Sequence, residues 1–196
     1  MPNAMSEPRK IALFGGTFDP VHLGHVQLAE AARNTLALDQ VRFLPCRISP
    51  HKSGTTPTDA ADRLEMLRLA TRDLPWAVVD DFEVQREGPS FSWQTAEAMR
   101  ARFPAARLFW IMGTDQWDVL PTWAHPKRLA ASVEFIVFAR GTAPLPRDGY
   151  ILHVVEDGHP ASATAIREAI AAGETNHPWL NPAVAGWIHD HGLYRQ

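Results

Sequence analysis

The feature that most constrains the fold is a regular alternation of short apolar segments with longer stretches of helical spacing. An apolar segment at residues 10–14 stops at Gly15-Gly16, and residues 25–38 then carry apolar side chains at the spacing of a helix. The same unit recurs, with a strand expected at residues 41–44 and a helix at residues 59–73. Alternation of this kind predicts an α/β fold with a doubly wound, mostly parallel sheet.

The rest of the chain continues the alternation. Further strands are expected at residues 77–84, 107–112, 133–138 and 151–155, a helix at residues 92–102, and two closing helices at residues 162–172 and 181–191. Pro121 and Pro126 interrupt a helical region before the fifth strand. Without an internal repeat or a linker, the 196 residues predict a single domain over 1–196, with 1–9 as an N-terminal tail and 162–196 as its C-terminal helical part.

Composition excludes several classes of protein. The formal net charge is −3, and no run of Lys and Arg exceeds two residues, which argues against non-specific binding of nucleic acid. No apolar stretch approaches the roughly 20 residues that span a bilayer, so no membrane association is predicted. The N-terminal residues lack the apolar segment of a secretory signal, and Cys46 is the only cysteine. A cytoplasmic location is therefore expected.

The turn after the first strand carries the strongest chemical signal. It joins the carboxyl end of a buried strand to a helix, and ligands of open α/β sheets bind at that edge. Gly15 and Gly16 allow the backbone to approach a phosphate, and the amides that open the helix favour an anion. His22 and His25 lie three residues apart and can face one crevice if the helix begins near Leu23. The alternatives are a tight turn with capping histidines, or a zinc site, which would want a third ligand.

Two separated motifs resemble a known family. Gly15 to His25 is similar to the GGTFDPVHxGH signature of the bacterial nicotinate-nucleotide adenylyltransferases, within the HxGH nucleotidyltransferase superfamily. Residues Ser162 to Arg167 resemble the superfamily's SxTxxR phosphate motif. Weaker similarities lie in a Pro-His-Lys loop at residues 50–52 and in the segments 113–115 and 120–123. The resemblance implies a Rossmann-like nucleotidyltransferase fold and transfer of AMP from ATP to nicotinate mononucleotide in NAD biosynthesis.

The resemblance also implies which residues bind ATP. The catalytic residues are expected to be His22, His25, Lys52 and Arg167. The ATP-binding residues are expected to be Gly15, Gly16, Thr17, Phe18, His22, His25, Gly113, Asp115, Ser162, Thr164 and Arg167. Among these, Asp115 could instead cap a helix, Ser162 could be an ordinary N-cap with Arg167 in solvent, and Lys52 could be a surface residue.

The mononucleotide is expected to contact a second set of residues. By resemblance these are Ser90, Phe91, Ser92, Trp93, Trp123, His51 and Lys52. The turn at residues 90–93 would offer backbone N–H groups to the nicotinate carboxylate, and Trp123 would stack on the pyridine ring, with core packing as its alternative. Phe91 and Trp93 depart from the Ser-Tyr-Thr sequence that is usual in relatives. This departure most affects the expected preference for nicotinate mononucleotide over nicotinamide mononucleotide.

The expected chemistry needs alignment and charge stabilisation rather than a base. A phosphate monoester has a second pKa of about 6 and is mostly ionised near pH 7. The site must align two polyanions and stabilise the charge that develops on the α-phosphate. Mg²⁺ is expected to enter with ATP, held mainly by substrate phosphates, and no dedicated protein metal site is predicted. The expected partners are thus ATP, nicotinate mononucleotide and, as a possibility, further copies of the chain.

Three other functions compete with this interpretation. A nicotinamide-mononucleotide adenylyltransferase and a pantetheine-phosphate adenylyltransferase use related motifs, although His22 and the length of the chain favour the pyridine-nucleotide family. A non-catalytic nucleotide sensor of the same fold would need affinity for ATP but no group that acts only on the transition state. Both histidines, Lys52 and Arg167 argue against the sensor.

Overall fold

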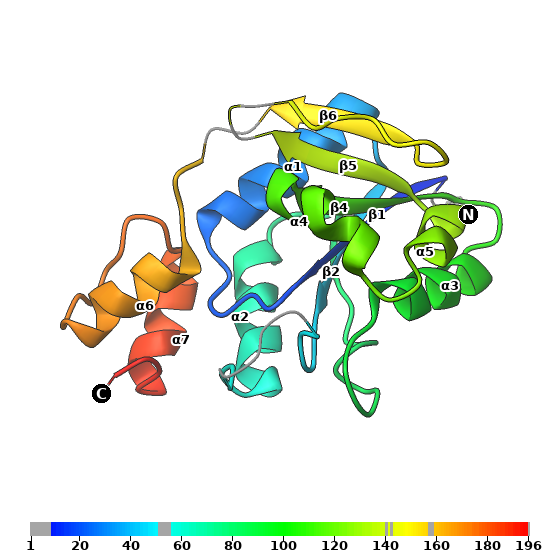
Figure 1. The fold of residues 1–196 in the computed structure, drawn as a ribbon. Helices are drawn as coiled ribbons and strands as arrows, with labels where there is room; N and C mark the ends of the chain where they lie inside the picture. Colours follow the sequence, from blue (N-terminus) through cyan, green and yellow to red (C-terminus); the bar gives the residue numbers. More distant parts are fainter. Residues whose placement is uncertain (1–8, 51–55, 140, 142, 157–158, 196) are drawn as a thin grey trace, which may run out of the picture.

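A parallel sheet forms the centre of the molecule. The computed structural model describes residues 9–50, 56–139, 141, 143–156 and 159–195. The strands are β1 (Lys10–Gly16), β2 (Gln40–Pro45), β3 (Ala77–Val79), β4 (Arg107–Gly113), β5 (Glu134–Ala139) and β6 (Leu152–Glu156). All neighbouring strands are parallel, in the order β3-β2-β1-β4-β5-β6 (Figure 1). The prediction of a doubly wound α/β fold is confirmed.

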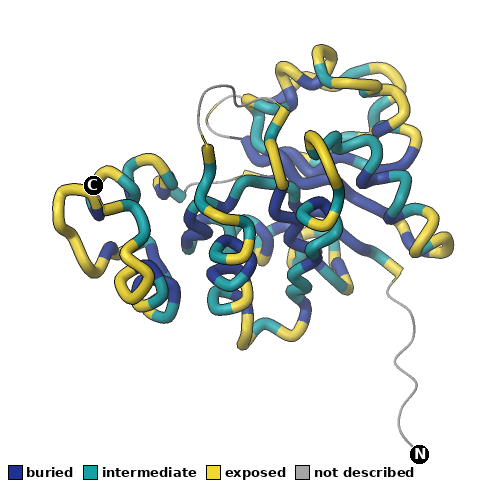
Figure 2. The backbone as a smooth tube through the Cα atoms, turned by 90° about the horizontal axis from the view of Figure 1, so that it is seen from below, coloured by how far each residue is buried: buried dark blue, intermediate teal, exposed yellow. Residues whose placement is uncertain are grey.

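Helices cover both faces of the sheet. They are α1 (Leu23–Leu36), α2 (Ala60–Thr71), α3 (Ser92–Arg102), α4 (Thr114–Val119), the 3₁₀ turn η1 (Leu120–Thr122), α5 (Pro126–Ser132), α6 (Ala163–Ala171) and α7 (Pro182–Asp190). Buried residues of α1, α2, α6 and α7 pack on one face, and those of α3, α4 and α5 pack on the other. Figure 2 shows the strands buried between these exposed outer layers.

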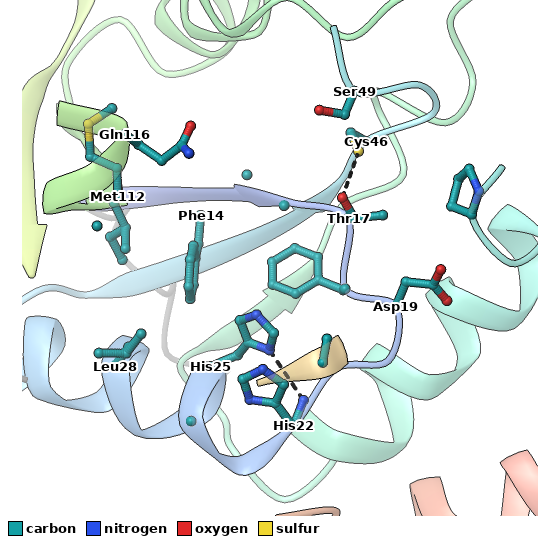
Figure 3. Close-up of a pocket in the computed structure, with 18 of the residues that line it drawn as sticks. Phe14, Thr17, Asp19, His22, His25, Leu28, Cys46, Ser49, Met112 and Gln116 are labelled. Carbon is teal, nitrogen blue, oxygen red and sulfur yellow. Dashed lines mark hydrogen bonds between the residues drawn. The ribbon is translucent and has the colours of Figure 1, made fainter. Parts of the chain in front are cut away.

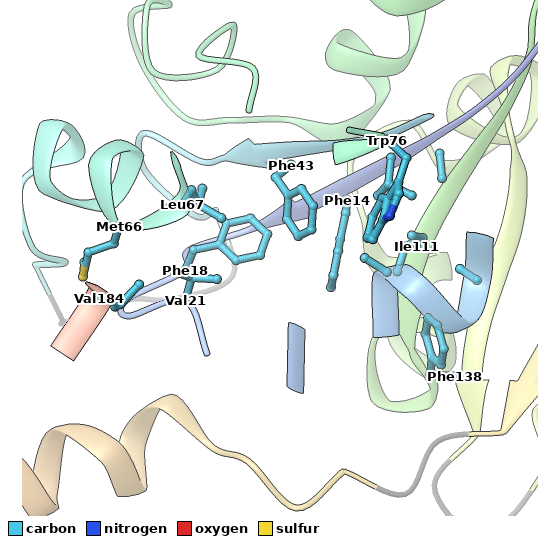
Figure 4. Packing of buried hydrophobic residues seen from close by; sticks show 14 of the residues in the cluster. Phe14, Phe18, Val21, Phe43, Met66, Leu67, Trp76, Ile111, Phe138 and Val184 are labelled. Atoms are coloured by element: carbon cyan, nitrogen blue, oxygen red, sulfur yellow. The ribbon is translucent and has the colours of Figure 1, made fainter. Parts of the chain in front are cut away.

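The alternation of side chains along β1 explains why two cores form. Ile11 and Leu13 face the core that α3, α4 and α5 cover, whereas Ala12 and Phe14 face the core that α1 and α2 cover. All four side chains are buried, because a parallel strand with helices on both sides has no solvent face. Figure 4 shows Phe14 beside Phe43 in the second of these cores.

Three element boundaries differ from the expectation. β1 continues through Gly15 and Gly16, which still pair with β2. The strand expected at residues 77–84 ends at Val79, because the Asp80 carboxylate accepts the backbone N–H of Phe82 at 3.1 Å and turns the chain. The interrupted helical region divides into α4, η1 and α5, with Pro121 and Pro126 in the first turns of η1 and α5.

The order of the strands determines where a ligand can bind. From β1 the chain moves outward to β2 and β3, then returns across the sheet to β4, β5 and β6. β1 and β4 are therefore neighbours whose following helices lie on opposite faces, which leaves a crevice at their carboxyl ends. The glycines that end both strands, Gly16 and Gly113, border this crevice.

Candidate functional site

A cavity of about 850 Å³ opens at the carboxyl ends of β1 and β4. Its walls come from the β1–α1 turn, residues 46–50 and 56–58, the first turns of α3 and α4, the start of α6 and the C-terminal Tyr194. The two motifs that resemble phosphate-binding sequences therefore meet in one place. His51 and Lys52 lie outside the described residues, so their predicted roles stay predictions.

Two glycines of the first motif lie in closely packed surroundings. A Cβ atom on Gly15 would lie 2.9 Å from the Trp110 ring, closer than carbon atoms can approach. A Cβ atom on Gly24 would lie 3.0 Å from Nδ1 of His159 and 3.1 Å from Nδ1 of His22. Both glycines thus allow the turn to pass beneath the cavity with its histidines packed tightly.

The two histidines form a stacked pair at the start of α1. Their ring centroids are 3.7 Å apart with an interplanar angle of 24° (Figure 3). His22 occupies the N-cap position, and its backbone N–H donates to Nδ1 of His25 at 3.2 Å. Because Nδ1 accepts, a neutral His25 carries its proton on Nε2. Nε2 is then an N–H donor, which is the kind of group that a phosphate oxygen accepts.

The turn itself is held by a buried aromatic ring and a buried cation. Phe18 has a φ angle of 51°, a left-handed conformation that costs a non-glycine residue free energy. Its ring packs at 5.5 Å from Phe14 and 5.0 Å from His25, edge to face. Nη1 of Arg63, which is 1% exposed, donates to the carbonyl oxygen of Thr17 at 2.9 Å. The conformation of the turn therefore depends on tertiary contacts.

The C-terminal motif docks directly on this turn. Ser162 is the N-cap of α6, and its hydroxyl accepts the N–H of Ala165 at 3.5 Å. Nη1 of Arg167 donates to the carbonyl oxygen of Asp19 at 2.7 Å, across 148 residues of sequence, and Nη2 donates to Oγ1 of Thr164 at 3.3 Å. Arg167 is therefore fixed beside the β1–α1 turn and lines the same cavity.

Asp115, which was predicted to contact the adenosine part of ATP, lies at the start of α4. Gly113 occupies the N-cap position, so the alternative that Asp115 caps this helix is wrong. Asp115 is the second residue of α4, is exposed, and lines the cavity. Its Oδ2 accepts from Nε2 of Gln116 at 3.2 Å. A carboxylate in this position can accept hydrogen bonds from hydroxyl groups, and its role in binding ribose stays a prediction.

The predicted mononucleotide residues divide into two groups. Ser90, Ser92 and Trp123 line the cavity, while Phe91 and Trp93 are not among its lining residues. The Trp93 ring packs instead beneath the guanidinium of Arg128, whose Cζ lies 4.0 Å from the ring centroid. The Trp93 side chain thus serves the contact between α3 and α5, and the predicted contact of its backbone N–H with the mononucleotide stays a prediction.

One backbone donor of the predicted turn is already occupied. The N–H of Ser90 donates to the carbonyl oxygen of Ile48 at 3.0 Å, and its hydroxyl accepts the N–H of Arg47 at 3.0 Å. The amides of Ser92 and Trp93 open α3, where a helix leaves its first N–H groups without an intrahelical acceptor. These helix amides, rather than that of Ser90, are the candidate donors to a carboxylate.

Among the cavity-lining residues that the sequence analysis did not name are four with polar, ionisable side chains: Asp19, Glu83, His159 and Tyr194. Burial raises the pKa of Glu83, which accepts from Oγ1 of Thr95 at 2.7 Å and also bonds Ser90. Asp19 belongs to the glycine-rich motif and could have been found there. The other three lie in segments without a recognisable local pattern.

The described residues contain no group of three His, Cys, Asp or Glu side chains arranged to hold a metal ion. Nor does any helix in those parts of the chain have the length and apolar character needed to cross a membrane. The groups that do line the cavity include Arg167 and the stacked imidazoles of His22 and His25, which are suited to a polyphosphate.

Comparison with known proteins agrees with this geometry. A family model described as cytidylyltransferase-like matches residues 13–169, which places the chain in that class of nucleotidyltransferases. A probable nicotinate-nucleotide adenylyltransferase of Neisseria meningitidis serogroup B is 36% identical over 96% of this chain and 100% of its own length. One from Thermus thermophilus is 38% identical over 95% of this chain and 100% of its own length. The chain belongs to the nicotinate-nucleotide adenylyltransferase family, as its motifs predicted.

Solved structures share the fold. Nicotinic acid mononucleotide adenylyltransferase of Plasmodium falciparum, complexed with NaAD, superposes with a TM-score of 0.78 at 15% identity, covering 95% of this chain and 97% of that one. A putative nicotinate-nucleotide adenylyltransferase of Vibrio parahaemolyticus superposes with a TM-score of 0.71 at 19% identity, covering 96% of both chains. At these identities the superpositions establish the fold.

Proposed function

We propose that this chain transfers AMP from ATP to nicotinate mononucleotide, forming nicotinate adenine dinucleotide and releasing pyrophosphate. The observation that carries the proposal is the meeting of the stacked pair His22 and His25 with Arg167 in one cavity, opposite Trp123 and the start of α3. The membership of the chain in the nicotinate-nucleotide adenylyltransferase family supports the same reaction.

The nucleophile needs no activation by the protein. The 5′-phosphate of the mononucleotide is mostly ionised near pH 7, so an oxygen of that phosphate can attack the α-phosphorus of ATP directly. The bond to the bridging oxygen of the β-phosphate breaks as the new bond forms, and pyrophosphate leaves with the electron pair. The protein contributes by holding both polyanions in line, which lowers the entropic part of the barrier.

The histidines supply donors for the charge that develops in the transition state. The contact between the His22 amide and Nδ1 of His25 orients the His25 ring and assigns its proton to Nε2. A donor that is oriented before reaction stabilises an oxyanion without further reorganisation. We assign His25 to the α-phosphate, with His22 and Thr17 placing the phosphates beside it.

Arg167 and the start of α6 suit the β- and γ-phosphates. The guanidinium is oriented by Asp19 and Thr164, and the amides that open α6 add the partial positive charge of a helix N-terminus. Charge at this end stabilises the leaving pyrophosphate. Mg²⁺ would add to that neutralisation, and the expectation that it enters with ATP stays a prediction.

The mononucleotide would lie across the cavity from α6. The helix amides at Ser92 and Trp93 would bind the nicotinate carboxylate, and the Trp123 indole would stack on the pyridine ring. A carboxylate accepts from both amides, whereas a carboxamide turns its NH₂ group toward at least one. We therefore expect kcat/KM for nicotinate mononucleotide to exceed that for nicotinamide mononucleotide by about 30- to 1,000-fold.

The test is to supply Mg-ATP with each mononucleotide separately and to measure both pyrophosphate and dinucleotide. Trp123→Ala should lower kcat/KM for both mononucleotides by a similar factor, since stacking does not distinguish acid from amide. Trp187→Ala is the control, because this indole bonds Asp62 on the α2–α7 contact, outside the cavity. Near-equal wild-type values would indicate a dual-specificity enzyme, and a higher kcat/KM for nicotinamide mononucleotide would indicate a nicotinamide-specific one. Turnover only with pantetheine phosphate, or ATP binding without turnover, would refute the proposal.

A cytoplasmic location and self-association also remain proposals. Neither is needed for the chemistry, because every group assigned above belongs to one chain.

A further inference from the structure

Tyr194, near the end of the chain, reaches into the phosphate side of the cavity. Its hydroxyl donates to Oδ1 of Asp19 at 2.6 Å, across 175 residues of sequence. Its φ angle is 63°, in the left-handed region that a residue with a Cβ atom adopts only when other contacts hold it there. Tyr194 is partly buried and packs against the core that α1, α2, α6 and α7 cover. The end of the chain is therefore held in a strained conformation that delivers one hydroxyl to one carboxylate.

Asp19 is the point at which three distant segments meet. Oδ1 accepts from Tyr194, and Oδ2 accepts the backbone N–H of Thr58 at 3.1 Å. The main-chain oxygen of the same residue accepts from Nη1 of Arg167 at 2.7 Å. Asp19 thus connects the glycine-rich turn with the segment before α2, with α6 and with the C-terminus.

The carboxylate of Asp19 carries the wrong charge for a phosphate site. Arg167 already contacts the main chain of Asp19, so a carboxylate free to rotate could form an ion pair with that guanidinium. Such a pair would neutralise the cation that the phosphates need. Two donors, one on each carboxylate oxygen, prevent this rotation. Burial and then the bond to Asp19 raise the pKa of Tyr194, so its hydroxyl keeps the proton that it donates.

We infer that Tyr194 is a positioning residue for ATP: its hydroxyl holds the Asp19 carboxylate away from Arg167, so that the guanidinium stays available to the β- and γ-phosphates. The inference rests on the proposed function only in taking ATP as the ligand. In this role Tyr194 acts through Asp19 and Arg167.

The first test is titration of the whole chain with Mg-ATP alone, followed by calorimetry, which needs no turnover. Tyr194→Phe removes the hydroxyl and keeps the ring, and we expect ATP affinity to fall by about tenfold, or ~1.4 kcal/mol. Tyr150→Phe is a matched control, since Tyr150 packs against Trp117 and Phe135 and does not line the cavity. Its ATP affinity and melting temperature should equal those of the wild type.

The second test asks whether the effect passes through the charge of Asp19. In an Asp19→Asn background there is no carboxylate to compete for Arg167, so Tyr194→Phe should change ATP affinity by less than about twofold. An equal tenfold loss in both backgrounds would overturn the inference, because the hydroxyl would then act independently of Asp19. Unchanged affinity in Tyr194→Phe would overturn it as well, and so would loss of the cooperative melting transition, which would make Tyr194 structural.

These outcomes are separate from those that test the proposed function. A wild-type chain that binds ATP but forms no dinucleotide would refute the proposed reaction and leave the ATP titrations fully interpretable. A wild-type chain that forms dinucleotide, with a Tyr194→Phe variant of normal ATP affinity, would refute only the role of Tyr194.

Discussion

Replacement of Arg63 by methionine should destabilise the fold and weaken ATP binding together. Arg63 lies on α2 and is 1% exposed. Its Nε donates to the carbonyl oxygen of Thr58 at 2.8 Å, and its Nη1 donates to those of Thr17 at 2.9 Å and Cys46 at 2.8 Å. Among the described residues its partners are these three carbonyls, with no ion-paired carboxylate. The side chain therefore joins three segments that line the cavity.

The size of the effect follows from two opposing contributions. A hydrogen bond from a charged donor contributes about 1.5–3 kcal/mol, so losing three removes about 5–9 kcal/mol. Removal of the buried charge returns several kcal/mol of desolvation free energy. We expect a net loss of about 2–4 kcal/mol, which for a chain of 196 residues lowers the melting temperature by roughly 5–15 °C.

The measurement is urea unfolding followed by tryptophan fluorescence, with thermal melting as a second probe. Arg63→Lys keeps the charge but cannot span all three carbonyls, so its loss of stability should be smaller than that of Arg63→Met. Arg68→Met is the matched control on the same helix, because Arg68 is exposed and only pairs with Glu65, and it should change stability by less than about 0.5 kcal/mol.

ATP affinity provides the functional half of this prediction. Thr17 and Cys46 line the cavity and would lose the donor that holds their carbonyl oxygens, so Arg63→Met should bind ATP more weakly than Arg68→Met does. A loss of stability below about 1 kcal/mol, or equal values for the two methionine variants, would refute the reasoning, since a partnered buried cation should not be replaceable at so little cost.

Three further predictions address single groups. His25→Ala should lower kcat by about 10²-fold or more while changing ATP affinity little, because its donor acts mainly on transition-state charge; a change confined to KM in steady-state assays would contradict this. Arg167→Ala should weaken ATP and pyrophosphate but not nicotinate mononucleotide, as titration with each can establish. Equal loss for all three would remove Arg167 from the phosphate site. Burial raises the pKa of Glu83 above 4.5, so its protonated form favours folding and this contribution disappears as the pH rises through the raised value. Glu83→Gln should therefore raise the melting temperature near pH 7.5 and not near pH 4, and an equal difference at both values would disprove the argument.

Local sequence patterns determined much of this fold. α3 spans the predicted residues. α6 begins directly after the predicted cap Ser162, because capping chemistry acts within a few residues. The glycine-rich turn and the Ser162 to Arg167 segment are also local patterns, so both could be recognised before their positions in space were known. Trp123 was predicted to contact a ligand because segment 120–123 resembles the family, and its side chain lines the cavity.

Contacts between distant segments decided the rest. Trp93 and Trp123 could both have faced a ligand, and only the packing of α5 on α3 places Trp93 beneath Arg128 and away from the cavity. The strand at residues 77–84 was overestimated because the carboxylate of Asp80 ends it, and that carboxylate is held by Arg42 of β2 at 2.7 Å. Neither outcome follows from apolar periodicity.

Only the tertiary structure decides which side chains hold the groups of the site in place. Arg63 and Tyr194 carry no motif, yet they hold the carbonyl oxygen of Thr17 and the carboxylate of Asp19 from 46 and 175 residues away in the sequence. A local pattern can specify a helix, a strand or a turn, since those depend on neighbouring residues. The partner of a side chain depends on which segments the folded sheet brings together, and for Asp19 those segments lie as far away as Arg167 and the C-terminus.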